Sequence, residues 1–172
     1  MLAHRRRWSN WVDCAYFICL MCYSGHGLIG IRRRVQIIVR PDEGNTITAP
    51  LAAARPHDDI IRLLKKRSLP GGTVHAFNGS IQQAETYIAM GFKLGFGGML
   101  TFERSRHLRR LASELALESL VLETDAPDMT VASHQYQRNS PAYLPEILTT
   151  MATLRDLPEQ AVAARTTANA RE

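Results

Sequence analysis

Beyond Pro56 the chain alternates between short apolar runs and amphipathic stretches, and this alternation is the feature that most constrains its fold. The apolar runs cover residues 73–77, 92–98 and 119–124, which are lengths typical of buried strands. Helical patterns begin at Pro56, cover 81–90 and 104–117, and begin again at Pro141 and Pro158. Strands that alternate with helices are typical of parallel βαβ units. We therefore predict an α/β fold with three strands and at least five helices after Pro56.

Signals at the helix ends support this prediction. Pro56 suits the first turn of a helix, and Asp58 and Asp59 suit its positive N-terminal end. Ser80 is a typical cap for the helix over 81–90, and Gly91 can close that helix in the left-handed conformation. These residues predict where the first two helices begin and where the second one ends.

The length and charge of the chain set limits on its architecture. Its 172 residues allow a domain with a substantial core, whereas a complete eight-stranded (β/α) barrel needs about 250 residues. The formal net charge is +5, and residues 1–50 hold most of the excess, with seven arginines against three acidic residues. The basic character is therefore a property of the N-terminal segment.

Residues 1–50 form an atypical segment that we separate from residues 51–172. Residues 41–55 show no period of two or of 3.6, which predicts a linker or boundary. Arginine clusters at 5–7 and 32–34 can contact phosphates or an anionic surface. This segment is interpreted as an unrelated extension or the product of a frameshift.

All three cysteines lie in the same segment, at Cys14, Cys19 and Cys22. An odd number of cysteines confined to one place argues against a secreted disulfide framework and favours a cytoplasmic protein. Their spacing is compatible either with a fragment of a soft-metal site or with a thiol-rich core patch. The apolar stretch 12–31 could be a membrane anchor, but Asp13 and His26 make it a poor spanning helix, so we expect no membrane association.

Two of the predicted strands end in side chains of the kinds that bind metals. His75 lies in the run 73–77, and Asp125 follows the run 119–124. The carboxyl ends of parallel strands face a shared site, so this placement predicts metal-assisted chemistry. A catalytic zinc usually takes three protein ligands, so two side chains are fewer than a working centre needs.

Longer motifs surround these two residues. Val-His-Ala-Phe-Asn-Gly-Ser begins at Val74, Gly-Phe-Lys-Leu-Gly begins at Gly91, and Leu-Glu-Thr-Asp-Ala-Pro-Asp begins at Leu122. Arg-Asn-Ser-Pro follows at 138–141, and Thr-Ala-Asn-Ala lies at 167–170. In this order the motifs closely resemble the C-terminal part of the TatD family of metal-dependent hydrolases, from about Arg55 to the C-terminus.

The resemblance implies a fold and a chemistry. The fold would be a partial (β/α) TIM barrel of the amidohydrolase type that lacks the usual N-terminal strands. The chemistry would be hydrolysis of phosphodiester bonds, typically in DNA, with two divalent ions such as Mg, Mn or Zn. By resemblance, His75 and Asp125 are metal ligands, and Asp125 is also the catalytic residue that takes a proton from water. Glu123 supports the site. Asp128 and His134 lie in the following loop, where simple solvation is the ordinary explanation and substrate contact is the alternative.

Other expected ligands have no counterpart in the chain. The family's His-x-His is absent because no two histidines are separated by one residue. The positions expected for a histidine of the fifth strand hold Ala52, Ala53 and Ala54, and His57 lies inside the next predicted helix. We therefore expect a truncated hydrolase whose activity is impaired and whose metal occupancy is low.

Alternative functions remain open at this point. The chain could be a non-catalytic remnant or a module that binds nucleic acid or a partner. The face formed by Arg104, Arg106, Arg109 and Arg110 could attract DNA, although a solvated surface is the ordinary explanation.

The glycines at 95, 97 and 98 are expected to permit close packing. Three parallel strands would leave two exposed sheet edges, which predicts self-association.

Overall fold

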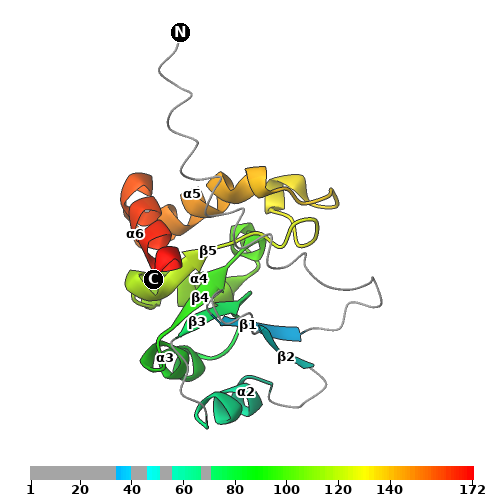
Figure 1. The fold of residues 1–172 in the computed structure, drawn as a ribbon. Helices are drawn as coiled ribbons and strands as arrows, with labels where there is room; N and C mark the ends of the chain where they lie inside the picture. The colour runs from blue at the N-terminus through cyan, green and yellow to red at the C-terminus, as the bar shows by residue number, and fades with distance from the viewer. Residues whose placement is uncertain (1–33, 40–45, 51–55, 67–70) are drawn as a thin grey trace. The chain divides into compact units, whose positions relative to one another are not determined.

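The computed structural model describes residues 34–39, 46–50, 56–66 and 71–172 (Figure 1). These residues divide between Gly95 and Phe96 into two compact units. We call the described residues up to Gly95 the first unit, and Phe96–Glu172 the second unit. The three cysteines, the stretch 12–31 and the alanines at 52–54 lie outside the described residues. Among the described helices, none is long and apolar enough to cross a membrane.

The first unit is a mixed sheet with two helices. Its strands are β1 (Arg34–Val39), β2 (Thr46–Pro50), β3 (Gly72–His75) and the start of β4 (Phe92–Phe96). β3 and β4 are parallel, with Gly72 opposite Phe92 and Val74 opposite Leu94. The helices are α2 (Pro56–Leu64) and α3 (Ile81–Ala89), and the core contains Ile60, Leu64, Val74, Phe77, Tyr87, Phe92 and Leu94.

The linker that we predicted over residues 41–55 is wrong in part. Thr46–Pro50 form β2, which pairs antiparallel with β1 from Arg34 opposite Pro50 to Ile38 opposite Thr46. β1 also pairs antiparallel with β3, so this edge of β3 is covered. β2 is a strand because its backbone pairs with that of β1. The alternation of apolar and polar residues within 46–50 does not predict such a pairing. Self-association through the sheet stays a prediction.

Helix α3 begins and ends as the sequence predicts. The Ser80 side chain accepts a hydrogen bond from the Gln83 amide at 3.2 Å, and the Gln83 side chain accepts one from the Ser80 amide at 2.9 Å. This reciprocal cap satisfies two amides that have no partner in the helix. Gly91 follows the helix with φ at +83°, which is the left-handed conformation that glycine adopts without strain.

The second unit packs helices on β5 (Leu120–Leu122) and on one another. The short helices are η3 (Gly98–Thr101), η4 (Leu117–Ser119), η5 (Ala132–His134) and η6 (Pro141–Tyr143), and the α-helices are α4 (Arg106–Glu114), α5 (Leu144–Arg155) and α6 (Glu159–Arg171). α5 contacts η3, α4, β5 and α6, and α6 contacts β5 and η4. Fully buried apolar residues fill the space between them, including Leu100, Leu120, Val121, Ile147, Met151 and Val162.

Two polar side chains join these helices to the backbone of their neighbours. The Arg155 guanidinium donates to the carbonyls of Ala112 and Leu115, the latter at 2.8 Å, where α4 ends. The Asn169 amide nitrogen donates to the carbonyls of Leu117 and Leu120, both at 2.7 Å. Asn169 thereby attaches α6 to the first residue of β5, the strand that leads to Asp125.

Candidate metal and phosphodiester site

His75 is the last residue of β3 and is 7% exposed. It lies opposite Gln36 of β1 in the sheet register. The chain then leaves the strand through Ala76, which is left-handed with φ at +48°, and the Phe77 amide donates to the Gly95 carbonyl at 3.0 Å. His75 thus stands at the carboxyl end of β3, as the sequence predicts.

A second histidine of the first unit is buried beside the segment that follows β3. His57 is the second residue of α2, and its ring lies 5.2 Å from the Phe77 ring and 5.8 Å from the Tyr87 ring, centroid to centroid. Its Nε2 lies 3.4 Å from Asn78 Oδ1, and its Nδ1 lies 3.2 Å from the Tyr87 hydroxyl. The sequence pattern did not predict this cluster, because its members come from α2, α3 and the segment between them.

The chemistry of these partners defines the state of His57. A carbonyl oxygen such as Asn78 Oδ1 only accepts, so Nε2 carries the proton and Nδ1 is an acceptor. The Tyr87 hydroxyl lies 3.2 Å from Nδ1 and 3.4 Å from the His57 carbonyl oxygen, and either can accept its proton. Burial lowers the pKa of His57 below 6.5, although Asn78 and the nearby Asp58 charge act in the opposite direction. Burial, with a contribution from Asp58, raises the pKa of Tyr87, so its hydroxyl keeps the proton that it donates. The His57 ring is therefore neutral near pH 7, and both of its nitrogens contact polar neighbours.

We expect the stability of the first unit to decline as the pH falls below about 6.5. In that range the unfolded chain binds a proton on His57, while the folded imidazole, whose pKa is lowered, stays neutral until the pH is lower still. One proton contributes a slope of at most about 1.4 kcal/mol per pH unit to the free energy of unfolding. The measurement is chemical denaturation between pH 7.5 and pH 5 (about the range in which histidine titrates).

The His57→Phe variant should lose this part of the slope, since phenylalanine does not titrate. His107→Gln, which changes an exposed histidine of α4, serves as the matched control and should keep it. Equal slopes in His57→Phe and the unmodified chain would contradict the assignment.

The end of β5 in the second unit carries the predicted carboxylates. Glu123 is fully buried, Thr124 is 1% exposed, and Asp125 is partly exposed. The Glu123 amide donates to the carbonyl of Phe96 at 3.1 Å, so this segment runs beside the end of β4. A Cβ placed on Gly97 would lie 3.6 Å from Asp125 Oδ2 and 3.7 Å from Glu123 Cγ. Both side chains therefore lie against Gly97, on the same side of the strand.

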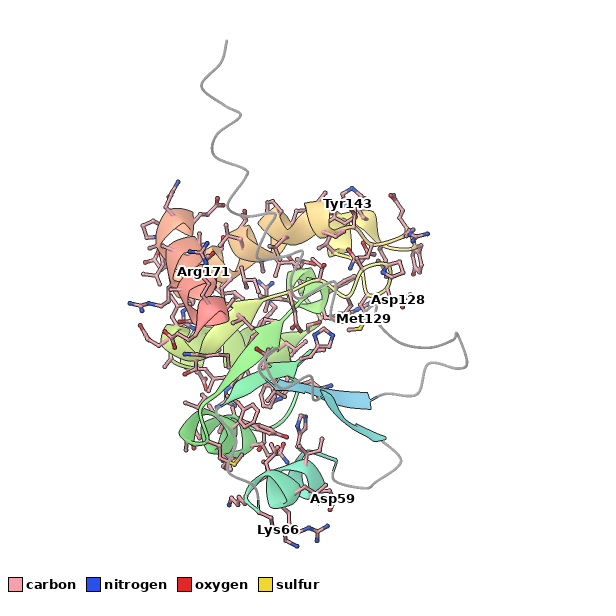
Figure 2. The ribbon with its side chains drawn as sticks, in the orientation of Figure 1. Asp59, Lys66, Asp128, Met129, Tyr143 and Arg171 are labelled. Atoms are coloured by element: carbon pink, nitrogen blue, oxygen red, sulfur yellow. The ribbon has the colours of Figure 1, made fainter. Side chains whose placement is uncertain are left out.

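The loop after Asp125 is held by Asn139, which is 5% exposed. Its side-chain amide donates to the Asp128 carbonyl at 2.6 Å, and its backbone amide donates to the Pro127 carbonyl at 2.9 Å. Figure 2 shows Asp128 and Met129 side by side in this loop. The Asp128 amide donates back to the Asp125 carbonyl at 2.7 Å. The motif at 138–141 thus has a clear structural role, which is to fasten the loop that begins at Asp125.

Gly98 brings the same loop close to the backbone of η3. A Cβ at this position would lie 2.5 Å from the Met129 carbonyl oxygen and 3.0 Å from the Thr130 carbonyl oxygen. Backbone atoms cannot move aside as a flexible side chain can, so only glycine fits here. The prediction that the glycines at 95, 97 and 98 permit close packing is confirmed for Gly98. At Gly97 an added Cβ would meet its nearest neighbours at ordinary contact distances of 3.5 to 3.7 Å.

The predicted basic face is largely engaged with its own unit. The Arg104 guanidinium lies 4.8 Å from the centre of the Phe102 ring, and Arg109 donates to the Leu100 carbonyl at 3.2 Å. Arg110 pairs with Glu114 at 2.8 Å. These contacts favour an ordinary solvated surface over a dedicated DNA-binding face.

The predicted ligands suit a divalent metal in kind but not in number. Imidazole and carboxylate groups both bind such ions, and His75 and Asp125 stand at strand ends in separate units. Within the parts of the chain that the structure describes, no group of three or more His, Cys, Asp and Glu side chains is placed to hold a metal ion. The described residues therefore do not make a complete metal centre by themselves.

Comparison with known proteins gives a family for this chain. The family model described as TatD related DNase matches residues 53–172. The chain is 40% identical over 114 residues to the uncharacterized metal-dependent hydrolase YjjV of Escherichia coli, covering 66% of this chain and 44% of that protein. It is 42% identical over 110 residues to the 3'-5' ssDNA/RNA exonuclease TatD of Salmonella typhimurium, covering 60% and 42%. The chain thus spans less than half the length of these curated relatives.

Solved structures agree with the sequence match. The crystal structure of the Escherichia coli TatD homologue YJJV superimposes with a TM-score of 0.62 at 39% identity, covering 67% of this chain and 45% of that one. A TatD family hydrolase from Entamoeba histolytica has a TM-score of 0.51 at 20% identity, which supports the fold. The predicted α/β fold is therefore confirmed. Since the family model covers well over half of the residues, the chain belongs to the TatD-related DNase family.

Proposed function

We propose that this chain is part of a divalent-metal-dependent hydrolase that cleaves phosphodiester bonds in DNA or RNA. His75 and Asp125 are metal ligands in this proposal, and Asp125 is the catalytic residue. Relatives named as metal-dependent hydrolases and as 3'-5' ssDNA/RNA exonucleases support the reaction class. His75 ends β3, and Asp125 lies three residues beyond the last residue of β5. This placement supports their roles, because βα loops at the carboxyl ends of strands carry active sites in barrels of this kind.

The observation that carries the proposal is the anchoring of Asp125. Its carboxylate lies against Gly97, its carbonyl accepts from Asp128, and Asn139 fastens the loop beyond it. The preceding Glu123 and Thr124 are buried, so the strand end is firmly packed. The backbone that carries the carboxylate is thus held in place, which supports a preorganised group, as a catalytic residue must be to act at a fixed position on a substrate.

The reaction needs one proton acceptor near the attacking water. Water adds to phosphorus as the bond to the leaving sugar oxygen breaks, and the water's proton must be removed during attack. Asp125 can take that proton, since a carboxylate positioned in this way acts as a general base. The leaving oxygen is protonated from solvent, which leaves one phosphomonoester end and one hydroxyl end.

We further propose that hydrolysis by this chain is weak. The ligand-type side chains of the described residues do not form a set of three, and tight binding of a catalytic metal usually requires one. The division into an atypical segment, 1–50, and a TatD-like portion, 51–172, is part of this proposal. Cytoplasmic location remains an expectation of the same kind.

The test is hydrolysis of a fluorescent single-stranded oligonucleotide with manganese, magnesium or zinc, and with EDTA instead. The TatD exonuclease of Salmonella typhimurium, assayed in parallel, provides the reference rate. We expect cleavage that is stimulated by metal, abolished by EDTA and slower than that of the exonuclease. Metal-independent cleavage would overturn the proposed role of the metal. No cleavage at any metal concentration would overturn the proposal in favour of a non-catalytic module.

Metal content measured by mass spectrometry after dialysis separates the causes of weak activity. Close to two ions per chain would overturn the proposed ligand deficit, since the remaining ligands would then come from residues outside the described ranges. Substoichiometric metal would support the deficit.

A further inference from the structure

The loop from Ala126 to Ser140 exposes an aromatic ring almost completely. Tyr136 is 96% exposed, which is the highest value among the large apolar side chains of the described residues. Its backbone is left-handed, with φ at +68°. A tyrosine has no intrinsic preference for that conformation, so the fold must hold it there. Met129 in the same loop is also left-handed, at +49°, and is 47% exposed.

The loop around Tyr136 is fastened on both sides. Before it, the His134 ring stacks on the Tyr143 ring with centroids 4.0 Å apart and planes 17° apart, and Figure 2 labels Tyr143 at this position. His134 Nδ1 lies 3.4 Å from the Glu146 carboxylate, and the Ser133 hydroxyl donates to the same carboxylate. After it, Asn139 holds the loop to the Pro127 and Asp128 carbonyls. Tyr136 is therefore displayed from a braced loop.

The charges near Tyr136 suit a flexible anionic strand better than a compact anion. Arg138 is exposed two residues further on and can pair with one phosphate, whereas Asp128 and Glu146 lie in or near the same loop and oppose a dense cluster of phosphates. Binding must then depend on two contacts, which are stacking on the Tyr136 ring and one ion pair between Arg138 and a phosphate. Single-stranded nucleic acid offers this combination, since its bases present free faces and every base can stack on an aromatic side chain.

We propose that Tyr136 is a stacking platform for a base of a single-stranded nucleic acid, with Arg138 contacting the adjacent phosphate. This inference rests on the proposed function, because the same loop begins at Asp125. A duplex is a poor fit, since its base faces are already stacked on each other. The platform places the strand on the loop that leads to the candidate catalytic carboxylate.

The experiment is equilibrium binding by fluorescence anisotropy in EDTA, where no hydrolysis occurs. The probes are an oligothymidylate of about twelve nucleotides and a strand of equal length made of abasic units. We expect the thymidylate to bind more tightly than the abasic strand. Tyr136→Ala should weaken thymidylate binding by about 5- to 100-fold and leave abasic binding unchanged. Tyr136→Phe, which keeps the ring, should bind like the unmodified chain.

Two further variants complete the design. Arg138→Gln should weaken both probes and reduce the slope of log affinity against log salt by about one. Leu157→Ala, a truncation of another exposed apolar residue of the second unit, is the matched control and should change neither probe. All these residues are exposed, so circular dichroism should show each variant folded.

The outcomes separate this inference from the proposed function. Equal binding of the two probes, no measurable binding, or unchanged affinity in Tyr136→Ala overturns the platform, even where metal-stimulated hydrolysis is present. Base-dependent binding that is lost in Tyr136→Ala supports the platform, even where no hydrolysis is found. Association of the chain with itself that is lost in Tyr136→Ala, without affinity for thymidylate, would overturn it in favour of a protein interface.

Discussion

Asp125→Asn should reduce metal-stimulated hydrolysis of single-stranded DNA by at least about 100-fold. Replacing a group that only orients a metal ligand typically lowers metal affinity or activity by about 10- to 100-fold. Asp125 is proposed to be both a ligand and the general base, so its replacement should lower the rate by at least about 100-fold. Asparagine has the size of aspartate but is neutral, so it binds a divalent ion weakly and does not accept a proton from water. The measurement is the initial rate of oligonucleotide cleavage at saturating manganese.

The matched control is Asp128→Asn, three residues further along the same loop. Asp128 is exposed, and its backbone amide, which contacts the Asp125 carbonyl, is unchanged by the substitution. We expect a small effect on the rate. Equal losses in both variants would point to a general charge effect of the loop, and a retained rate in Asp125→Asn would refute its assigned role. Thermal unfolding of each variant checks that the fold is intact.

Asn169→Ala should lower the free energy of unfolding of the second unit by about 1 to 3 kcal/mol. The Asn169 side chain is 2% exposed and donates to two carbonyls, those of Leu117 and Leu120. Alanine removes both donors. The buried Leu120 carbonyl then loses a partner, at a cost of about 1 to 3 kcal/mol, whereas the part-buried Leu117 carbonyl still accepts from the Leu120 amide. The transition is measured by urea denaturation followed by circular dichroism.

Two further variants define the cause of that loss. Asn169→Asp keeps the shape but replaces the donor by an oxygen that faces two carbonyl oxygens, so it should destabilise the unit at least as much as alanine. Gln160→Ala changes an exposed residue of the same helix and should have a negligible effect. A loss below about 0.5 kcal/mol in Asn169→Ala would show that the amide does not dock α6, since surface substitutions reach that size.

The path of the chain after Pro56 could be predicted because local signals agree there. Pro56 begins α2, and the apolar runs around Val74, Leu94 and Val121 form β3, β4 and β5. Ser80 caps α3 and Gly91 follows it in the left-handed conformation. Each of these features depends on residues close in sequence. The ends of the elements were less well predicted. The strand expected over 92–98 ends at Phe96, and η3 begins two residues later, at Gly98.

The hairpin of β1 and β2 could not be predicted, because its strands are defined by pairing with each other and with β3. The burial of His57 has the same kind of cause. Inside its helix it gives no signal of function, yet the fold brings Asn78 and Tyr87 to its two ring nitrogens.

The sequence by itself determined the order of strands and helices after Pro56, the family motifs and the choice of His75 and Asp125 as candidate ligands. These depend on periodicity, helix caps and residue types, which are local properties. Only the tertiary structure decided that Asp125 and Glu123 share the surface beside Gly97, that Asn139 and Asn169 fasten the chain on either side of the candidate site, and that Tyr136 is displayed from a braced loop. The physical reason is that these contacts join residues far apart in sequence, so they exist only once the helices have packed on the strands.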